Sequence, residues 1–77
     1  MRIREGCILT ATNSCDESVK SLIGCKGALH VVNGEPLRFT VGTNRSFTTA
    51  ATKRLGVIGV NIFVSTVSGT EYTFEFR

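Results

Sequence analysis

Cys15 and His30 are the side chains best suited to covalent or acid–base chemistry. The chain has three cysteines and a single histidine. A cysteine in the first turn of a helix can act as a nucleophile, and a histidine can serve as its base. However, we can name no third residue to orient the histidine. Cys15 also falls on the apolar face of a predicted helix, where free cysteines are usually structural. We therefore favour a structural role for Cys15 and keep a small thiol enzyme as an alternative.

The cysteines and the histidine could also ligate zinc. Cys7, Cys15, Cys25 and His30 follow the spacing C-x₇-C-x₉-C-x₄-H, which lacks the tight C-x₂₋₄-C knuckle of structural zinc sites. We therefore expect no metal and no cofactor, and keep a zinc protein as a lower-ranked alternative. An odd number of cysteines argues against a closed disulfide framework. Together with an N-terminal segment that lacks a signal-peptide pattern, it favours a reducing, cytoplasmic compartment.

A polar loop is the first candidate anion site. Thr43, Asn44, Arg45 and Ser46 follow a predicted strand and precede a predicted helix. Such a loop can present amides, hydroxyls and a guanidinium to a phosphate or carboxylate. The same residue types are common in ordinary turns, and the segment does not match the phosphate-binding P-loop pattern. An ordinary loop is the interpretation we favour.

A basic surface is the wider alternative. Nine Lys and Arg against six Asp and Glu give a net charge of +3. A nucleic-acid- or anion-binding module would use Arg38, Arg45, Lys53 and Arg54. The basic residues are dispersed along the chain, whereas nucleic-acid binders usually cluster them on one face. We therefore favour a solvated surface over a nucleic-acid interface.

Strand patterns cover most of the chain. The predicted strands are Ile3–Thr12, Ala28–Val32, Leu37–Val41, Val57–Val67 and Thr70–Arg77. The last of these alternates apolar and polar residues with the period of a half-buried strand. Asn33-Gly34, between the second and third strands, predicts a hairpin with a type I′ turn, in which both residues have positive φ.

The main helix is predicted over Ser14–Ile23. Ser14 and Glu17 form an S-x-x-E capping box. Cys15, Val19, Leu22 and Ile23 share one helical face. Gly24 follows as the left-handed residue that ends a helix. Ten residues are marginal for an isolated helix, so this one is expected to pack on a sheet.

A second, short helix is predicted over Phe47–Gly56, with Thr48 or Thr49 as its cap. The resulting order, β-α-β-β-(α)-β-β, predicts an α+β fold. Its antiparallel sheet would have about five strands, with one main helix packed on one face.

Composition predicts one compact domain over residues 1–77. The hydrophobic content of 42% excludes a disordered chain. The longest apolar stretch, near Val57–Val64, is too short and too interrupted to span a membrane. Seventy-seven residues leave no room for a second core.

The final hairpin predicts the interaction surface. A three-residue Val67-Ser68-Gly69 loop would pair Val64 with Tyr72, Ile62 with Phe74 and Val60 with Phe76. This register collects the apolar side chains on one face, and register follows the buried face. Asn61, Phe63, Ser65 and Val67 would then occupy the opposite face, beside Glu71, Thr73 and Glu75.

Phe63 is the apolar anomaly on this outer face. The chain offers no credible catalytic set, and a small core with open sheet edges is often stabilised by oligomerisation. The leading hypothesis is therefore a non-enzymatic binding or assembly module that forms a homo-oligomer, as a dimer. A different protein partner and nucleic acid remain alternatives, and no membrane association is expected.

Overall fold

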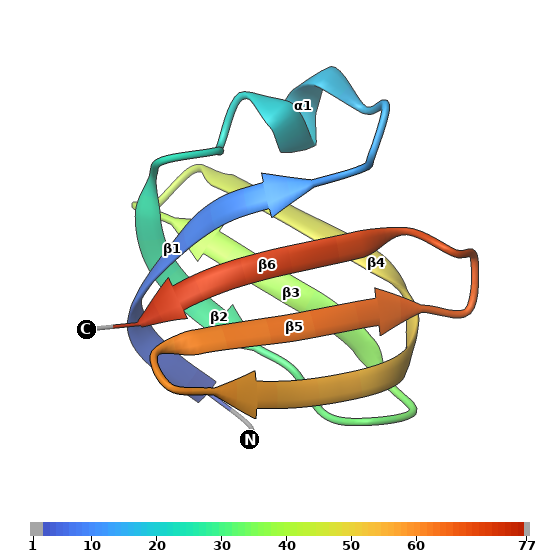
Figure 1. The fold of residues 1–77 in the computed structure, drawn as a ribbon. Coiled ribbons are helices and arrows are strands. Elements are labelled where there is room, and N and C mark those ends of the chain that lie inside the picture. Colours follow the sequence, from blue (N-terminus) through green and yellow to red (C-terminus); the bar gives the residue numbers. More distant parts are fainter. Residues whose placement is uncertain (1–2, 77) are drawn as a thin grey trace.

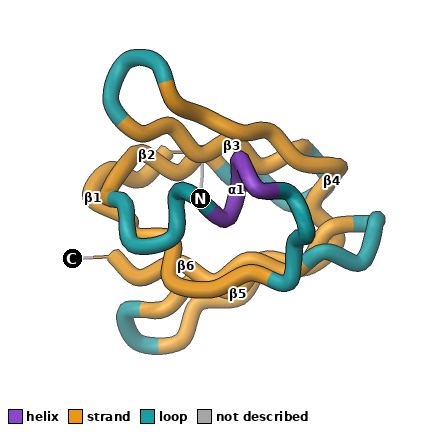
Figure 2. The backbone as a smooth tube through the Cα atoms, turned by 90° about the horizontal axis from the view of Figure 1, so that it is seen from above, coloured by secondary structure: helices purple, strands orange, loops and turns teal. Residues whose placement is uncertain are grey.

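The computed structural model describes residues 3–76, which form a closed antiparallel barrel of six strands (Figure 1). The strands are β1 (Ile3–Thr12), β2 (Lys26–His30), β3 (Pro36–Val41), β4 (Arg45–Ile58), β5 (Asn61–Thr66) and β6 (Glu71–Phe76). Each strand pairs with the next, and β6 returns to pair with β1. A short helix, α1 (Glu17–Lys20), lies in the connection from β1 to β2 and covers one end of the barrel (Figure 2).

An antiparallel sheet is present as predicted, but it has six strands rather than about five and closes into a barrel that leaves none of the expected open edges among the described strands. The α+β fold class is wrong. Strands hold 63% of the described residues and helix only 5%. The predicted main helix over residues 14–23 reduces to a single turn that starts at Asp16, whose carboxylate, rather than Ser14, caps it. Ser18 and Ser21 are weak helix formers, and closing the barrel leaves only its open end for a helix to cover. Val19 and Leu22 are buried there, whereas Cys15 and Ile23 are exposed.

The second predicted helix is also wrong, because residues 47–56 lie inside β4. β4 is fourteen residues long, and its first half pairs with β3 while its second half pairs with β5. Threonine is β-branched and fits a pleated strand better than a helix. Pairing of β4 with both β3 and β5 therefore overrides the helix-start signal at Thr48 and Thr49.

The register of the last hairpin is confirmed, but the predicted strand Val57–Val67 is wrong, because a turn after Ile58 divides it between β4 and β5. Ile62 lies opposite Phe74, and Val64 lies opposite Tyr72. Gly69 has a φ of 88° and donates its N–H to the Thr66 carbonyl at 3.0 Å, as the predicted three-residue loop requires. Alternation and turn chemistry are local, so the sequence pattern is sufficient for this hairpin.

The β2–β3 hairpin is present, but its turn type differs from the prediction. Only Gly34 has a positive φ, 90°, and the Glu35 N–H donates to the Val32 carbonyl at 3.0 Å. Positive φ at the third residue alone is the pattern of a type II turn. The turn docks on β4, because the Gly34 N–H donates to the Thr52 carbonyl at 2.9 Å and the Thr52 N–H donates to the Glu35 carbonyl at 2.8 Å.

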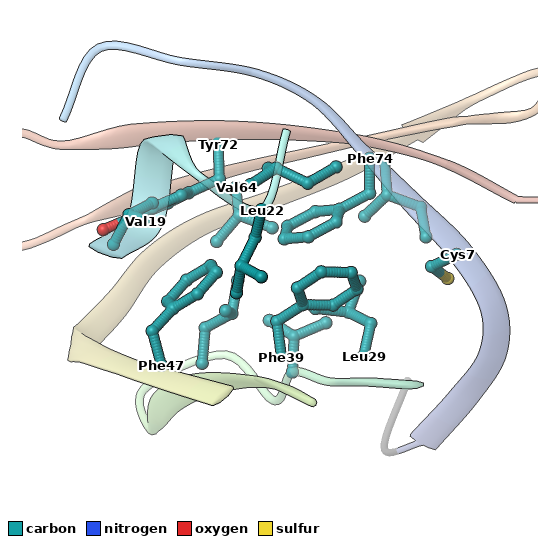
Figure 3. Packing of buried hydrophobic residues seen from close by; sticks show 13 residues of the cluster. Cys7, Val19, Leu22, Leu29, Phe39, Phe47, Val64, Tyr72 and Phe74 are labelled. Atoms are coloured by element: carbon teal, nitrogen blue, oxygen red, sulfur yellow. The ribbon is translucent and has the colours of Figure 1, made fainter. Parts of the chain in front are cut away.

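Aromatic rings fill the barrel interior (Figure 3). The Phe39 ring centroid lies 5.8 Å from that of Phe47 and 5.1 Å from that of Phe74, and Phe47 stacks on Tyr72 at 5.6 Å. Tilted and offset ring pairs of this kind add to the stabilisation from apolar burial. The interior is therefore a packed core.

Candidate interaction surface

The outer face of β4, β5 and β6 consists of three cross-strand rows. Each row has one residue from each strand, because β5 pairs with β4 on one side and β6 on the other. The rows are Ile58–Asn61–Glu75, Gly56–Phe63–Thr73 and Arg54–Ser65–Glu71. Phe63 therefore occupies the centre of this face.

Phe63 is the exposed aromatic on this face, with 41% of its surface accessible. Three more exposed apolar residues surround the β4–β5 turn beside it: Val57 at 49%, Ile58 at 71% and Val60 at 50%. Ile58 is diagonal to Phe63 on the same face, a separation that an aromatic side chain can bridge. We call Val57, Ile58, Val60 and Phe63 the hairpin-tip patch.

Sequence reasoning missed half of this patch. It placed Phe63 on the outer face and Val60 on the inner one, and it did not single out Val57 or Ile58. The available signal was the run of apolar residues on both sides of Gly59. Gly59 has a φ of 60°, as the first central residue of a tight two-residue hairpin turn requires. The turn lies at the end of the barrel, so apolar side chains pointing either way are exposed.

The predicted interface residues divide into two groups. Asn61, Phe63 and Ser65 share the outer face of β5, as expected from the register. Val67 is 64% exposed, but it lies beyond the last row, in the β5–β6 loop, where its N–H donates to the Ala51 carbonyl at 2.9 Å. Val67 and the β4–β5 turn therefore lie at opposite ends of β5.

Opposite charges flank Phe63. Arg54 lies on the β4 side and Glu71 on the β6 side, and both side chains are exposed. Among residues 3–76 the one ion pair within reach is Lys20 with Glu17, at 3.9 Å. Neither Arg54 nor Glu71 is therefore neutralised by another described residue. Lys53, also exposed, occupies the irregularity in β4 just before Arg54.

The predicted basic surface is spread out. Arg45 and Arg54 lie towards opposite ends of β4, with Lys53 next to Arg54, and Arg38 lies opposite Thr48 between them. The structure therefore distributes three of these cations along β4 and places the fourth, Arg38, on β3. Nucleic-acid binding stays a hypothesis that this arrangement does not favour.

The predicted anion-binding loop is a hairpin connection between β3 and β4. Val41 and Arg45 pair on either side of it, and Ser46 pairs with Thr40. Thr43 and Asn44 form its exposed tip. The Arg45 guanidinium donates to the Ser21 carbonyl at 3.3 Å and lies 3.4 Å from the Ser21 hydroxyl. Arg45 thus satisfies the carbonyl end of α1, a usual role for a cation there.

Cys15 and His30 are far apart. Cys15 is exposed in the segment after the end of β1, whereas His30 pairs with Ile3 at the start of β1. Ten residues of strand separate these two positions. The structure therefore does not bring the predicted nucleophile and base together.

The three cysteines have different environments and no disulfide. Cys7 is fully buried, Cys25 is half-buried and Cys15 is exposed. Burial raises the pKa of the Cys7 thiol, and the nearby Arg4 charge offsets part of this rise. Within residues 3–76, no three His, Cys, Asp or Glu side chains converge to hold a metal ion.

The surface has a shallow depression near the end of β1, which contains no convergent acid–base pair. It is lined by Ala11, Thr12, Asn13, Glu71 and Thr73. In the described part of the chain, helical segments are too short and polar to cross a bilayer.

Comparison with known proteins found no match. No family model, no curated protein and no solved structure is significantly similar to the chain. The functional proposal therefore depends on the surface geometry.

Proposed function

We propose that this protein is a small non-enzymatic binding module that assembles as a homodimer through the outer face of β5, β6 and the adjoining end of β4. The observation that carries this proposal is the exposure of Phe63 at the centre of that face, diagonal to the exposed Ile58. A contiguous exposed apolar patch commonly marks an interaction site. A symmetric contact would place one copy of the patch against the other.

The size of the face predicts a weak dimer. Three strands at a spacing of about 4.8 Å span on the order of 15 Å. A contact of this width buries less than the ~800 Å² per partner that is typical of stable complexes. We therefore expect association that depends on concentration, in the micromolar range or weaker.

The assignment as a binding module, rather than a thiol enzyme, is supported by the separation of Cys15 from His30, because these were the candidate nucleophile and base. The proposed compartment is the cytoplasm, which is supported by three cysteines without a disulfide.

The test is the solution mass, measured by sedimentation equilibrium over a wide range of protein concentration. We expect the native protein to dimerise and Phe63→Glu to remain monomeric over the same range. Ile23→Glu is the matched control, because Ile23 is similarly exposed, at 43%, but lies beside α1. A monomeric native protein would contradict the proposal, as would a folded Phe63→Glu variant with unchanged dimerisation.

A further inference from the structure

The charges beside Phe63 are arranged asymmetrically across the strands. Lys53 and Arg54 lie on the β4 side, and Glu71 lies on the β6 side. Arg54 and Glu71 belong to the same row, because both strands pair with β5 at Ser65. A positive margin and a negative margin therefore border the apolar centre at the same level along the strands.

We infer that the two copies pack face to face about a two-fold axis parallel to β5, with Arg54 of each copy against Glu71 of the other. This inference rests on the proposed function. A rotation of 180° about an axis along β5 keeps each row at its level and exchanges the two sides. β4 of one copy then lies over β6 of its partner, and Phe63 meets the partner's Phe63.

The central row is compatible with this arrangement. Gly56 is exposed, and a Cβ added there would meet no atom within 4 Å. The axis along β5 places the partner's Thr73 over Gly56, because Gly56 and Thr73 both belong to the Phe63 row. A strand position without a side chain lets a partner approach closely.

The alternative in-plane axis, across the strands, forms no contact between opposite charges at Arg54. That rotation keeps β4 over β4 and β6 over β6, and it reverses the direction along the strands. Arg54 would then lie over the partner's Ile58 rather than over the partner's Glu71. Complementary charges across an interface select its orientation, so they favour the axis along β5.

The curvature of the barrel explains why long charged side chains suit the margins. The closed sheet is convex on its outer surface, so β4 and β6 recede from a partner that contacts β5 (Figure 2). The closest contact would therefore be at the centre, with the long arginine and glutamate side chains at its margins. The ion pairs are solvent-exposed, so we expect the association to weaken with added salt.

The experiment uses two charge reversals, Arg54→Glu and Glu71→Arg, each measured alone and then mixed in equal amounts. Each variant alone would place like charges together twice in a homodimer. We expect its dissociation constant to rise about tenfold, since each exposed pair contributes weakly and two pairs change sign. A heterodimer of the two variants would restore both opposite-charge contacts, so the mixture is expected to regain dimers.

The matched controls are Arg38→Glu and Glu35→Arg, which make the same charge changes at exposed positions outside the face. We expect both to dimerise like the native protein. A dimeric native protein whose Arg54→Glu variant dimerises normally would overturn the orientation and leave the proposed function standing. If the two variants are monomeric alone and their mixture also stays monomeric, the orientation is likewise overturned and the proposed function still stands. A monomeric native protein would overturn both.

Discussion

Thr52 and Thr66 face each other across β4 and β5 inside the barrel, and within residues 3–76 only one of the two hydroxyls is hydrogen bonded. Both residues are 2% exposed. The Thr66 Oγ1 lies 2.8 Å from the Ser68 Oγ and 3.2 Å from the Thr70 carbonyl oxygen. The Thr52 Oγ1 has no hydrogen-bond partner among the described residues. A polar atom that loses water without a replacement bond destabilises the fold.

Replacing these threonines with valine is therefore expected to have opposite effects. Thr52→Val should leave the free energy of unfolding unchanged or raise it by up to about 1 kcal/mol, because no hydrogen bond is lost. Thr66→Val should lower it by about 1 kcal/mol. Urea denaturation of both variants checks this prediction. Equal destabilisation would show that the Thr52 hydroxyl is hydrogen bonded in solution.

A second prediction concerns Gly27, where β2 passes close to β3. A Cβ at this position would collide with the Thr40 carbonyl oxygen, which is backbone and cannot rotate away. Gly27→Ala should therefore cost about 1–3 kcal/mol of stability. Gly56→Ala is the control for folding, measured at concentrations at which the protein is monomeric. Its Cβ has open space within one copy, so it should be neutral or stabilise by about 0.5 kcal/mol. A Gly27→Ala variant with unchanged stability would mean that β2 and β3 can move apart at this position without lowering the free energy of unfolding.

A third prediction is an acid-dependent contribution from Asp16. Its Oδ1 accepts from the Ser18 hydroxyl at 2.7 Å and from the Ser18 N–H at 2.9 Å, and these bonds lower the pKa of the Asp16 carboxyl. The folded state therefore favours the carboxylate. This stabilisation is present above the unfolded pKa of about 3.9 and is lost as the pH falls through the lower, folded value.

The measurement is the thermal midpoint of the native protein, Asp16→Asn and Ser18→Ala between neutral pH and strong acid. The advantage of the native protein over Asp16→Asn should shrink below about pH 4. Ser18→Ala removes the hydroxyl that contributes most to the pKa shift, so it should show a smaller acid dependence. A gap between native and Asp16→Asn that stays constant with pH would contradict this account.

A fourth prediction is the order in which the cysteines react. Thiolate is the reactive form, and burial both raises the Cys7 pKa and excludes reagent. Under native conditions Cys15 should be labelled first, and Cys7 should react only as fast as the protein opens. Thiol-labelling kinetics of the native protein and Cys15→Ser test this. The variant should lack the fast phase, and a fast phase that persists would assign the accessible thiol to Cys25 or Cys7.

Several features were predictable from the sequence because they depend on local patterns. The segment 3–12 has the bounds of β1 as predicted. In the final hairpin, apolar alternation and a glycine at the loop were sufficient to pair Ile62 with Phe74 and to place Phe63 outside. A shift of one residue would move every side chain to the other face, so the pattern allows one register.

Other features were decided only by tertiary structure. The threonine-rich segment that begins at Thr48 carries a helix-start signal, yet strand pairing on both of its sides stabilises it as β4. The S-x-x-E signal at Ser14 likewise yields one turn, because the barrel closes on itself and offers a helix only its end. Long-range pairing also aligns Arg54 with Glu71 in one row, seventeen positions apart in the chain. No local pattern encodes that alignment, because it requires β4 to be a strand and to pair in register with β5.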